Sequence, residues 1–578
     1  MDRDNIVWKV AGAAGEGIMS TGLLFSKTCA RHGWYIFDYT EYPSLITGGH
    51  NTYQVHAAKH PVFSQNLNVD VLAAINKDGL DFHLEELAAN SVVLYDGQDD
   101  SINISEYRIK GKAIDLPMVE LARDVGGKEL MGNNVALGAS IYLFGLDLNL
   151  LEEVISDVFG DKGKEVVDLN KKAASIGFQY MAQKTRPILK VEKQPDVKHL
   201  TLTGNEAVCL GALAGGLQFY AAYPMTPSSS VLHYLAACAK KTPTQIVVKH
   251  AEDEISAANM ACGAAFAGTR AMVGTSGGGF CYMVEALGLC GVAELPVVFF
   301  EAMRPGPALG LPTWTAQGDL NFVLSASHGE FPRFVLAPGD AQEAFDIAKK
   351  SMELAEKYQT PVILLSDKYL AESRHTFKLD QTVFQNARFG LDFNPQIDDS
   401  GFYPRYELTD TGISKRSIPG FGWGPHLANS YTHTKYGLSS EESSDRKNQV
   451  DKRFRKMDLM TGEIPPQFWD VDLDAKITFI SFGSTKGSLL AAKQILKKDN
   501  IPVSILNLSW LWPFPKDQVK KVIESSRNVV VIEGNYLGQL AGLIAQETGV
   551  MIKERYHRFD GRPFYPEEIV TFVKNFKA

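Results

Sequence analysis

The chain has 578 residues, 45% of them hydrophobic and 22% charged, and a net charge of −9 at pH 7. This ordinary globular composition predicts about three or four domains, and the lack of a dominant basic tract argues against nucleic acid and anionic membranes as partners. No apolar run is long enough to span a bilayer and no signal peptide is apparent, so we expect a cytoplasmic protein.

The first domain is expected over residues 1–190, where the apolar strands "IVWKVAG", "VDVLAAIN" and "SVVLYDG" alternate with helical stretches. This alternation predicts a parallel α/β layer. The turn Gly12–Gly17 follows the first strand and opens a helix, where backbone N–H groups can approach a phosphate. Its spacing, GxxGxG, departs from the dinucleotide fingerprint GxGxxG. A tight turn without a ligand and a nucleotide or CoA site both remain open.

The pattern of strand and helix repeats over residues 198–391 and again over residues 471–578. Residues 392–470 are rich in Gly, Pro, Ser and Tyr and lack periodicity, which predicts a long loop or linker. The predicted fold class is therefore α/β, with several parallel-sheet domains.

Six cysteines are present, without a CxxC pair. Iron–sulfur clusters require clustered thiolates. We therefore expect structural thiols in a reducing compartment, and neither a cluster nor a metal site on this chain.

An apolar run stops abruptly at Tyr223-Pro224-Met225-Thr226-Pro227. Each proline fixes its own φ and biases the preceding residue towards an extended conformation, so Thr226 is presented with little entropy left to lose on binding a ligand. The alternative is a plain turn at the end of a strand, followed by a helix that Ser228 caps.

Three acids, Glu252, Asp253 and Glu254, precede a helix made largely of Ala, Gly and Ser. Capping of the helix N-terminus explains one or two of them. The small side chains allow the close approach of another backbone, a subunit or a flat ligand. A carboxylate at the head of such a helix, near "GTSGGG", suits a heteroaromatic ring nitrogen.

Four motifs in this order resemble the α subunit of 2-oxoacid:ferredoxin oxidoreductases, above all the 2-oxoglutarate enzymes. They are "YPMTPSS", Glu254 with "AANMACGAAFAG", "GTSGGGF" and "RPGPALGLPT" (Arg304–Thr313). The likeness continues through "GISKRSIPG", "NYLGQL" and "DGRPF", and residues 1–190 resemble the family's γ domain fused in front.

The resemblance implies a thiamine diphosphate enzyme. Residues 198–391 would bind the aminopyrimidine, and residues 471–578 would form a transketolase C-terminal-like domain. Glu254 would be catalytic, because its carboxyl group would bind the pyrimidine N1′ and favour the imino tautomer. The other residues expected at the cofactor are Pro224, Gly277 and Gly278.

The resemblance also places Thr226 and Arg304 at the substrate carboxylate, which a guanidinium matches bidentately. Thr313 and Tyr223 would assist, and Gly15 and Gly17 are expected at CoA. The C5 carboxylate of 2-oxoglutarate needs a further partner, for which the candidates are His50, Lys415 and Arg416. The chain has "TGGH" (Thr47–His50) where the family usually shows "RGGH".

The GDG motif and following Asn that grip Mg²⁺ and the diphosphate are missing. By resemblance, a β subunit supplies Mg²⁺, that grip and a [4Fe–4S] cluster, ferredoxin takes the electrons, and the assembly is (αβ)₂. The reaction would convert 2-oxoglutarate and CoA to succinyl-CoA and CO₂, reversibly. The alternatives are an α subunit for pyruvate or a branched-chain 2-oxoacid, a dinucleotide-dependent dehydrogenase, and a non-catalytic scaffold with the same fold.

Overall fold

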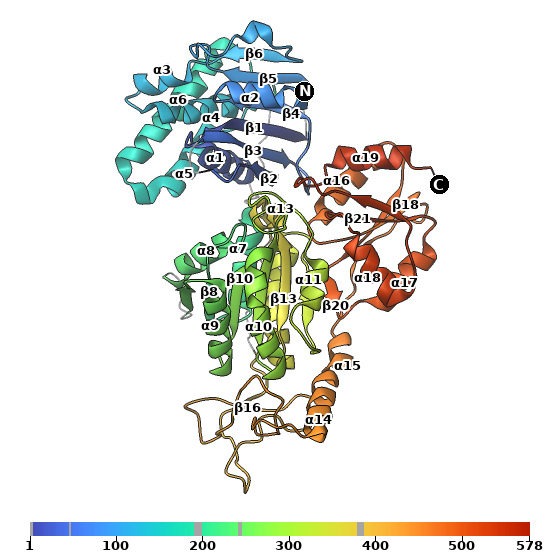
Figure 1. Ribbon diagram of the computed structural model, residues 1–578. Coiled ribbons are helices and arrows are strands. Elements are labelled where there is room, and N and C mark those ends of the chain that lie inside the picture. Colours follow the sequence, from blue (N-terminus) through green and yellow to red (C-terminus); the bar gives the residue numbers. More distant parts are fainter. Residues whose placement is uncertain (1–3, 46–47, 190–198, 241–245, 379–386, 578) are drawn as a thin grey trace.

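The computed structural model describes residues 4–45, 48–189, 199–240, 246–378 and 387–577. Three α/β units are visible (Figure 1). The N-terminal unit, in blue and cyan, lies above a green and yellow central unit; the C-terminal unit, in red, lies beside it, and an irregular segment lies below. The expected α/β class is confirmed. Within the described residues, no helix is long and apolar enough to cross a membrane.

The N-terminal unit is built on an eight-stranded sheet of order β6-β5-β4-β1-β3-β2-β14-β7. Its strands are β1 (Asn5–Ala14), β2 (Tyr35–Glu41), β3 (Gly48–Ala58), β4 (Val69–Ala74), β5 (Leu87–Tyr95), β6 (Lys112–Asp115), β7 (Leu200–Thr203) and β14 (Arg374–Phe377). Its helices are α1 (Ile18–Arg31), α2 (Lys77–His83), α3 (Met118–Asp124), α4 (Gly132–Leu143), α5 (Leu148–Phe159) and α6 (Lys164–Lys184).

The expectation of a parallel layer holds only for the half of this sheet formed by β1, β4, β5 and β6. Strand β3 pairs antiparallel with both β1 and β2. The cause is the short connection from β2 to β3, which carries no crossover helix, and a parallel pair needs such a crossover.

Two strands from the central part of the chain complete this sheet, because β14 pairs with β2 and β7. Arg374 in β14 donates to both carboxylate oxygens of Glu206, and its backbone N–H donates to Asp38 at 2.7 Å. Asp38 is buried, which raises its pKa to about 6. The N-terminal unit is therefore joined to the central unit by backbone pairing and by buried charge.

The central unit holds a seven-stranded sheet of order β20-β12-β13-β11-β10-β8-β9, parallel except for β20. Its strands are β8 (Phe219–Ala222), β9 (Val247–His250), β10 (Ala271–Thr275), β11 (Val297–Met303), β12 (Phe334–Leu336), β13 (Val362–Asp367) and β20 (Trp510–Trp512). Its helices are α7 (Gly204–Ala214), α8 (Ser229–Ala239), α9 (Glu254–Phe266), α10 (Gly277–Val292), α11 (Leu320–Ser325), α12 (Ala341–Tyr358) and α13 (Lys368–Glu372). The strands in the middle of the sheet, β10, β11 and β13, are buried along their whole length, as expected for a parallel sheet covered on both faces.

The C-terminal unit is a five-stranded sheet of order β17-β19-β18-β21-β22. Its strands are β17 (Phe468–Asp470), β18 (Ile477–Phe482), β19 (Val503–Leu508), β21 (Val529–Glu533) and β22 (Glu554–His557), and its helices are α16 (Thr485–Lys498), α17 (Lys516–Ser525), α18 (Gln539–Thr548) and α19 (Pro566–Asn575). Strand β20 leaves this unit and pairs antiparallel with β12, which joins the two sheets.

The segment expected to be a loop or linker is irregular up to residue 442, apart from the short strands β15 (Leu391–Asp392) and β16 (Arg416–Ser417). It then forms two helices, α14 (Ser443–Phe454) and α15 (Lys456–Thr461). The α14 sequence, SSDRKNQVDKRF, is almost entirely polar and has no hydrophobic period, so the helix was not predictable by that signal.

Candidate active site

The carboxyl end of the central sheet brings together the loops that follow four parallel strands. Strand β8 leads into the Tyr223–Ser228 loop, β9 into α9, β10 into α10, and β11 into Arg304. Ligands of open α/β sheets bind outside the carboxyl ends of the strands. The predicted cofactor and substrate residues therefore converge at the edge where such sheets bind ligands.

Glu254 is the first residue of α9, and it is not the residue that caps the helix. Asp253 is the N-cap, and its side chain accepts from the Ser256 N–H at 2.7 Å. Glu252 accepts from the Ser256 hydroxyl. Glu254 is only 6% exposed, and its Oε1 has no hydrogen-bond partner among the residues that the structure describes. Because a buried carboxylate without a partner is costly, this atom is the strongest indication of a ligand at the site.

The first turn of α10 forms the wall that faces Glu254. A Cβ on Gly279 would lie 2.7 Å from Glu254 Oε1 and 2.1 Å from Thr275 Oγ1. A Cβ on Gly277 would lie 2.5 Å from Asp319 Oδ2, whereas Gly278 has no atom closer than the Ala308 carbonyl oxygen at 3.6 Å. The glycine run thus leaves room for two carboxylates and an open surface between them, which suits a flat heterocycle.

Thr226 and Arg304 meet across the site. Arg304 Nη1 donates to the Thr226 carbonyl oxygen at 2.8 Å. Arg304 is 8% exposed, burial lowers the pKa of its guanidinium, and it forms no ion pair with any described acid. Its remaining donors, like the Thr226 hydroxyl, have no partner within the described parts of the chain. The arginine is therefore a buried cation placed to receive an anion.

The loop that carries Thr226 is braced from within. The Ser228 hydroxyl and N–H both donate to the Met225 carbonyl oxygen, at 2.8 and 2.9 Å. Ser228 makes no side-chain capping bond to α8, which removes the main support for a plain helix cap. Tyr223 is exposed, and Pro224 is half-buried beside it.

A buried carboxyl pair, which sequence reasoning missed, lies next to this site. Glu301 in β11 is fully buried, neither of its carboxylate oxygens has a hydrogen-bond partner among the described residues, and Asp319, the residue before α11, is its nearest acidic influence. Burial raises the pKa of Glu301 well above its usual value, and the neighbouring Asp319 adds to this. Burial also raises the pKa of Asp319 to about 6. The only signal in the sequence was one acid inside the apolar run "VVFFEAM".

Thr313 contacts the N-terminal unit, because its hydroxyl donates to the Tyr42 carbonyl oxygen at 2.6 Å. The loop from Thr315 to Asp319 is held by the C-terminal unit. The Gln317 backbone N–H donates to the Gly534 carbonyl oxygen, and its side-chain amide donates to the Phe482 carbonyl oxygen. The Thr315 backbone N–H donates to the Gly561 carbonyl oxygen. The motifs "NYLGQL" and "DGRPF" therefore position this loop.

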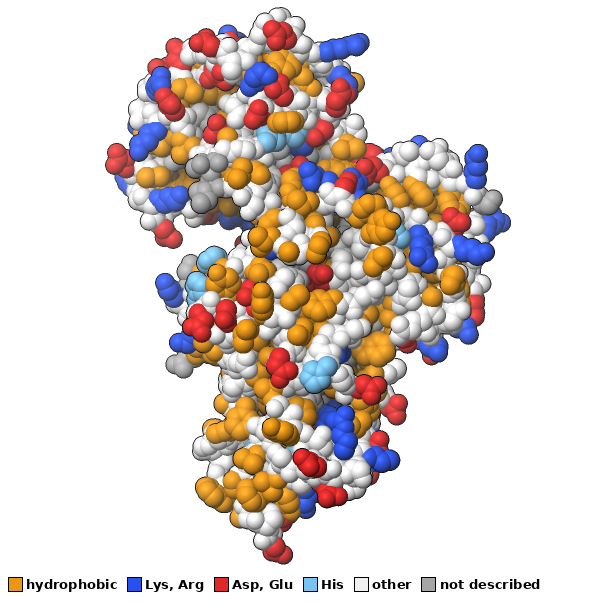
Figure 2. Space-filling view, viewed as in Figure 1, with side chains coloured by type: hydrophobic (Ala, Val, Ile, Leu, Met, Phe, Trp, Pro, Cys, Tyr) orange, Lys and Arg blue, Asp and Glu red, His pale blue; other side chains and the backbone are white. Residues whose placement is uncertain are grey.

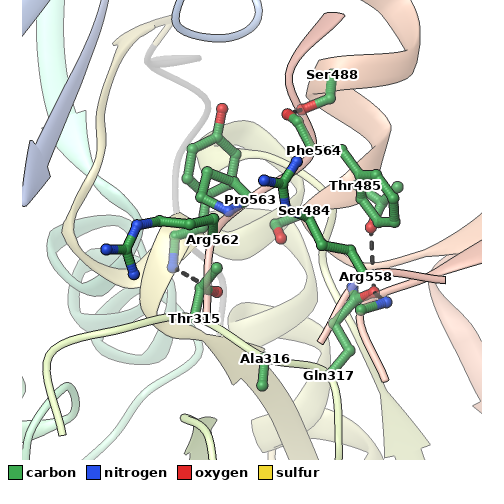
Figure 3. Close-up of a pocket in the computed structure, with 12 residues that line it drawn as sticks. Thr315, Ala316, Gln317, Ser484, Thr485, Ser488, Arg558, Arg562, Pro563 and Phe564 are labelled. Carbon is green, nitrogen blue, oxygen red and sulfur yellow. Dashed lines mark hydrogen bonds between the residues drawn. The ribbon is translucent and has the colours of Figure 1, made fainter. Parts of the chain in front are cut away.

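Figure 3 shows the junction of these units around a cavity of about 20 Å³, the size of roughly one water molecule. It is lined by residues of the 315–317 loop, α16 and the 558–564 segment. In this view the Thr485 hydroxyl donates a hydrogen bond to the Gln317 side-chain oxygen, and Arg562 points away from the cavity. The cavity is too small for a substrate, so it belongs to the packing that supports the site.

The glycine turn predicted for CoA is already partly occupied by its own side chain. Glu16 Oε2 accepts from the Ala13 N–H at 2.6 Å and from the Asn76 amide at 3.1 Å. Gly15 and Gly17 have φ of +100° and +75°, and Gly17 is the N-cap of α1. These positive φ angles, which favour glycine, account for both residues without a ligand.

The three candidates for the C5 carboxylate lie in different places. Arg416 is buried and donates to the Ala265 carbonyl oxygen at the end of α9, about 17 Å along the helix from Glu254. This position argues against Arg416 as a substrate residue, and the adjacent Lys415 is exposed. His50 lies in the N-terminal unit with its Nε2 2.7 Å from His83 Nε2, and burial with the neighbouring His83 lowers its pKa to about 4.

Three family models match the chain. Residues 7–180 match "Pyruvate ferredoxin/flavodoxin oxidoreductase", residues 210–451 match "Pyruvate flavodoxin/ferredoxin oxidoreductase, thiamine diP-bdg", and residues 475–569 match "Pyruvate:ferredoxin oxidoreductase core domain II". The unit that carries Glu254, Thr226 and Arg304 thus matches a thiamine diphosphate-binding domain.

Curated relatives match over almost the full length. The chain is 32% identical to the 2-oxoacid:ferredoxin oxidoreductase subunit alpha of a Sulfolobus species, over 97% of this chain and 95% of the relative. It is 28% identical to the 2-oxoglutarate oxidoreductase subunit KorA of Mycobacterium tuberculosis, over 99% and 91%. The solved 2-oxoglutarate:ferredoxin oxidoreductase from Magnetococcus marinus, with 2-oxoglutarate, coenzyme A and succinyl-CoA bound, superposes with a TM-score of 0.90 at 32% identity, covering 99% of both chains.

Proposed function

This chain belongs to the α subunits of the 2-oxoacid:ferredoxin oxidoreductase family, and we propose that its substrate is 2-oxoglutarate. The proposed reaction is 2-oxoglutarate, CoA and two oxidised ferredoxins to succinyl-CoA, CO₂ and two reduced ferredoxins. Two side chains at one edge of the central sheet carry the proposal. Within the described residues, Glu254 is a buried carboxylate whose Oε1 has no hydrogen-bond partner, and Arg304 is a buried arginine without an acidic partner.

The described residues fit thiamine diphosphate by their chemistry. Glu254 Oε1 is a buried atom that needs a polar partner, and Gly277, Gly278 and Gly279 leave the adjacent wall free of side chains. When bound, thiamine diphosphate supplies the electron sink for loss of CO₂ from a 2-oxoacid. Glu254 would hold a proton between its carboxyl group and a ring nitrogen of the aminopyrimidine, and its burial excludes water from that proton.

Arg304 and Thr226 would bind the carboxylate next to the 2-oxo group. Arg304 uses one donor on the Thr226 carbonyl oxygen and would keep the others for the substrate, to which the Thr226 hydroxyl would add a further donor. A guanidinium fork holds a carboxylate in one orientation, which a lysine cannot do. Pro224 and Pro227 limit the freedom that the loop loses on binding.

The choice of 2-oxoglutarate is supported by the Magnetococcus marinus enzyme, which was solved with 2-oxoglutarate bound. The C5 carboxylate would then need a second partner, either a hydrogen bond from His50, whose lowered pKa keeps it neutral, or a group on a partner subunit. Pyruvate or a branched-chain 2-oxoacid is the alternative substrate, and the family models carry the name of pyruvate. The dehydrogenase alternative is weakened by the glycine turn, whose GxxGxG spacing departs from the dinucleotide fingerprint.

We propose that a β subunit completes the site with Mg²⁺, the diphosphate grip and a [4Fe–4S] cluster in an (αβ)₂ assembly that reduces ferredoxin. Large apolar side chains close to the site in sequence are exposed: Tyr282, Leu309, Leu311, Tyr536, Leu537 and Phe559. Figure 2 shows hydrophobic side chains gathered over the central unit. Patches of this kind are typical of protein interfaces. CoA would enter between the subunits, with Gly15 and Gly17 as the proposed contacts.

The test is reduction of ferredoxin or a viologen by the chain co-expressed with its β partner. CoA is supplied with 2-oxoglutarate, pyruvate or 2-oxoisovalerate in turn. Preference for 2-oxoglutarate supports the proposal, whereas preference for another acid rejects the substrate and keeps the mechanism. A cluster-loaded complex that is inactive with every acid would favour the scaffold.

A further inference from the structure

A second polar pocket lies at the opposite end of α10 from the glycine run. Its volume is about 160 Å³, and it is enclosed by the C-terminal half of α10, the 327–331 loop, residues 430–432 and α14. Because α10 has 16 residues and is about 24 Å long, this pocket is separate from the site at Gly277–Gly279.

Arg453 of α14 lines this pocket and lacks the partner that a buried guanidinium normally has. It is 4% exposed, its Nε is buried without a hydrogen bond, and it makes no ion pair with any residue that the structure describes. Buried charged groups are almost always paired, because an unpaired one loses its hydration without compensation. Arg453 therefore offers unused donors to the pocket.

Ser327 gives an independent indication on the opposite wall. Its Oγ is also buried without a hydrogen bond. Its φ is +71°, a left-handed conformation that is strained for a serine and that the packed loop maintains. Two residues with unpartnered polar atoms, from separate elements, thus line one pocket, and Ser430 and Thr432 add hydroxyl-bearing residues to this lining.

The charge behind the pocket is strongly positive. Glu294 is buried with Lys452 Nζ at 2.6 Å and Lys456 Nζ at 2.5 Å, and buried Arg405 donates to its backbone carbonyl oxygen at 3.1 Å. With Arg453, four buried basic side chains lie around one carboxylate, and Lys452 is only partly charged near pH 7. The carbonyl groups at the end of α10 offset only part of this excess. Burial lowers the pKa of Lys452 to about 7, despite the attraction of Glu294.

The rim is mixed and exposed. The lining also includes two acids, Glu285 and Glu330, and two basic residues, Arg446 and His328, all of them exposed. These exposed charges are screened by water and salt, so the buried cations determine the sign of the potential inside.

We propose that this pocket binds a small tetrahedral oxyanion, either inorganic phosphate or the phosphate group of a small metabolite, on Arg453 and Arg446. The fork of Arg453 matches two anion oxygens, and the hydroxyl-bearing residues Ser430 and Thr432 belong to the same lining. The bound anion balances the buried positive charge of Arg453 and of the two lysines that contact Glu294, Lys452 and Lys456. The site does not depend on which 2-oxoacid the enzyme uses.

The experiment is calorimetric titration of the purified complex, loaded with thiamine diphosphate, with inorganic phosphate and with sulfate at constant ionic strength. We expect one saturable site per α chain. Arg453→Gln should weaken binding by roughly tenfold or more, because it removes a charge-assisted contact. Lys447→Gln is the matched control, since Lys447 lies on the same helix, is exposed and pairs only with Asp451; it should leave the affinity unchanged.

Arg446→Gln serves if the Arg453 variant does not fold, because Arg446 is exposed and its one contact is a 3.5 Å hydrogen bond to Thr432. It should weaken binding by about threefold or more. Titration with glycerol 3-phosphate separates the sources: tighter binding than inorganic phosphate indicates a metabolite, and weaker binding indicates the free ion. Absence of a saturable site, or equal loss in the Lys447 control, overturns the proposal.

Discussion

Glu254→Gln should separate stability from function, because Glu254 is a buried acid without a partner in the chain itself. The change keeps the size of the side chain and removes its charge. In the absence of cofactor, the wild-type protein carries the cost of burying Oε1 unpaired, about 1–3 kcal/mol and more for a charged group. We therefore expect the cofactor-free variant to be at least as stable as the wild type.

The difference in stability between variant and wild type can be measured in a thermal unfolding scan. For a unit of about 150–250 residues, each kcal/mol corresponds to about 2–4 °C in the transition temperature. The variant's central unit should thus unfold a few degrees higher. In the assembled enzyme the effect reverses: loss of the proton relay should lower kcat about 100-fold or more, and thiamine diphosphate should bind about tenfold more weakly.

The matched control is Glu252→Gln, two residues earlier. Glu252 is exposed and accepts only the Ser256 hydroxyl, so the same change in charge should alter neither the transition temperature nor kcat appreciably. The reasoning is refuted if Glu254→Gln retains most of the activity, or if it lowers the stability of the cofactor-free protein, because either result would make Glu254 a structural residue.

Four further changes test the rest of the site. Arg304→Lys should raise KM for the 2-oxoacid by roughly tenfold or more with a smaller change in kcat, as measured by viologen reduction, since the bidentate contact is lost. Gly279→Ala should weaken thiamine diphosphate binding in a direct titration, because the new Cβ would lie 2.7 Å from Glu254 Oε1. Leu309→Asp should reduce association with the β subunit in size-exclusion chromatography, because it places a charge on an exposed apolar side chain. Asp319 has a folded-state pKa of about 6, above its usual 3.8, so its stabilising contribution is complete below pH 3.8 and is lost as the pH rises through 6. Asp319→Asn should therefore be more stable than the wild type at pH 7, by up to about 3 kcal/mol, and the difference should vanish near pH 3.5; an equal difference at both pH values would contradict this.

The strands that end at the site were predictable because each is an apolar run followed by glycine, proline or an acid. Those signals are local, and they pointed to Thr226 and Glu254, which lie beyond the carboxyl ends of β8 and β9. Arg304, beyond β11, was expected from the family resemblance. The sequence could not show that Asp253, rather than Glu254, caps α9, since both are acids at the same helix end. The hydrogen bond from the Ser256 N–H to the Asp253 side chain makes that distinction, and it leaves Glu254 free for a ligand.

The features that escaped prediction depend on contacts between distant segments. The Glu301–Asp319 pair forms only when β11 and α11 pack together, and Arg416 is directed to the end of α9 by the fold of the irregular segment. Helix α14 is polar throughout and is anchored by Lys452 on Glu294, a single buried ion pair with no hydrophobic period. Buried charge pairing of this kind leaves no periodic trace in a sequence.

The unpaired groups at the site have one physical consequence in common. Glu254 is buried without a partner, Arg304 without an acid, and Leu309 is 72% exposed beside them. Each is a cost in the separate chain that a cofactor, a substrate or a partner subunit relieves, and a ligand that binds only the folded state stabilises it by mass action. If a β subunit completes the site as proposed, the stability of this chain should therefore rise with the concentrations of thiamine diphosphate and β subunit.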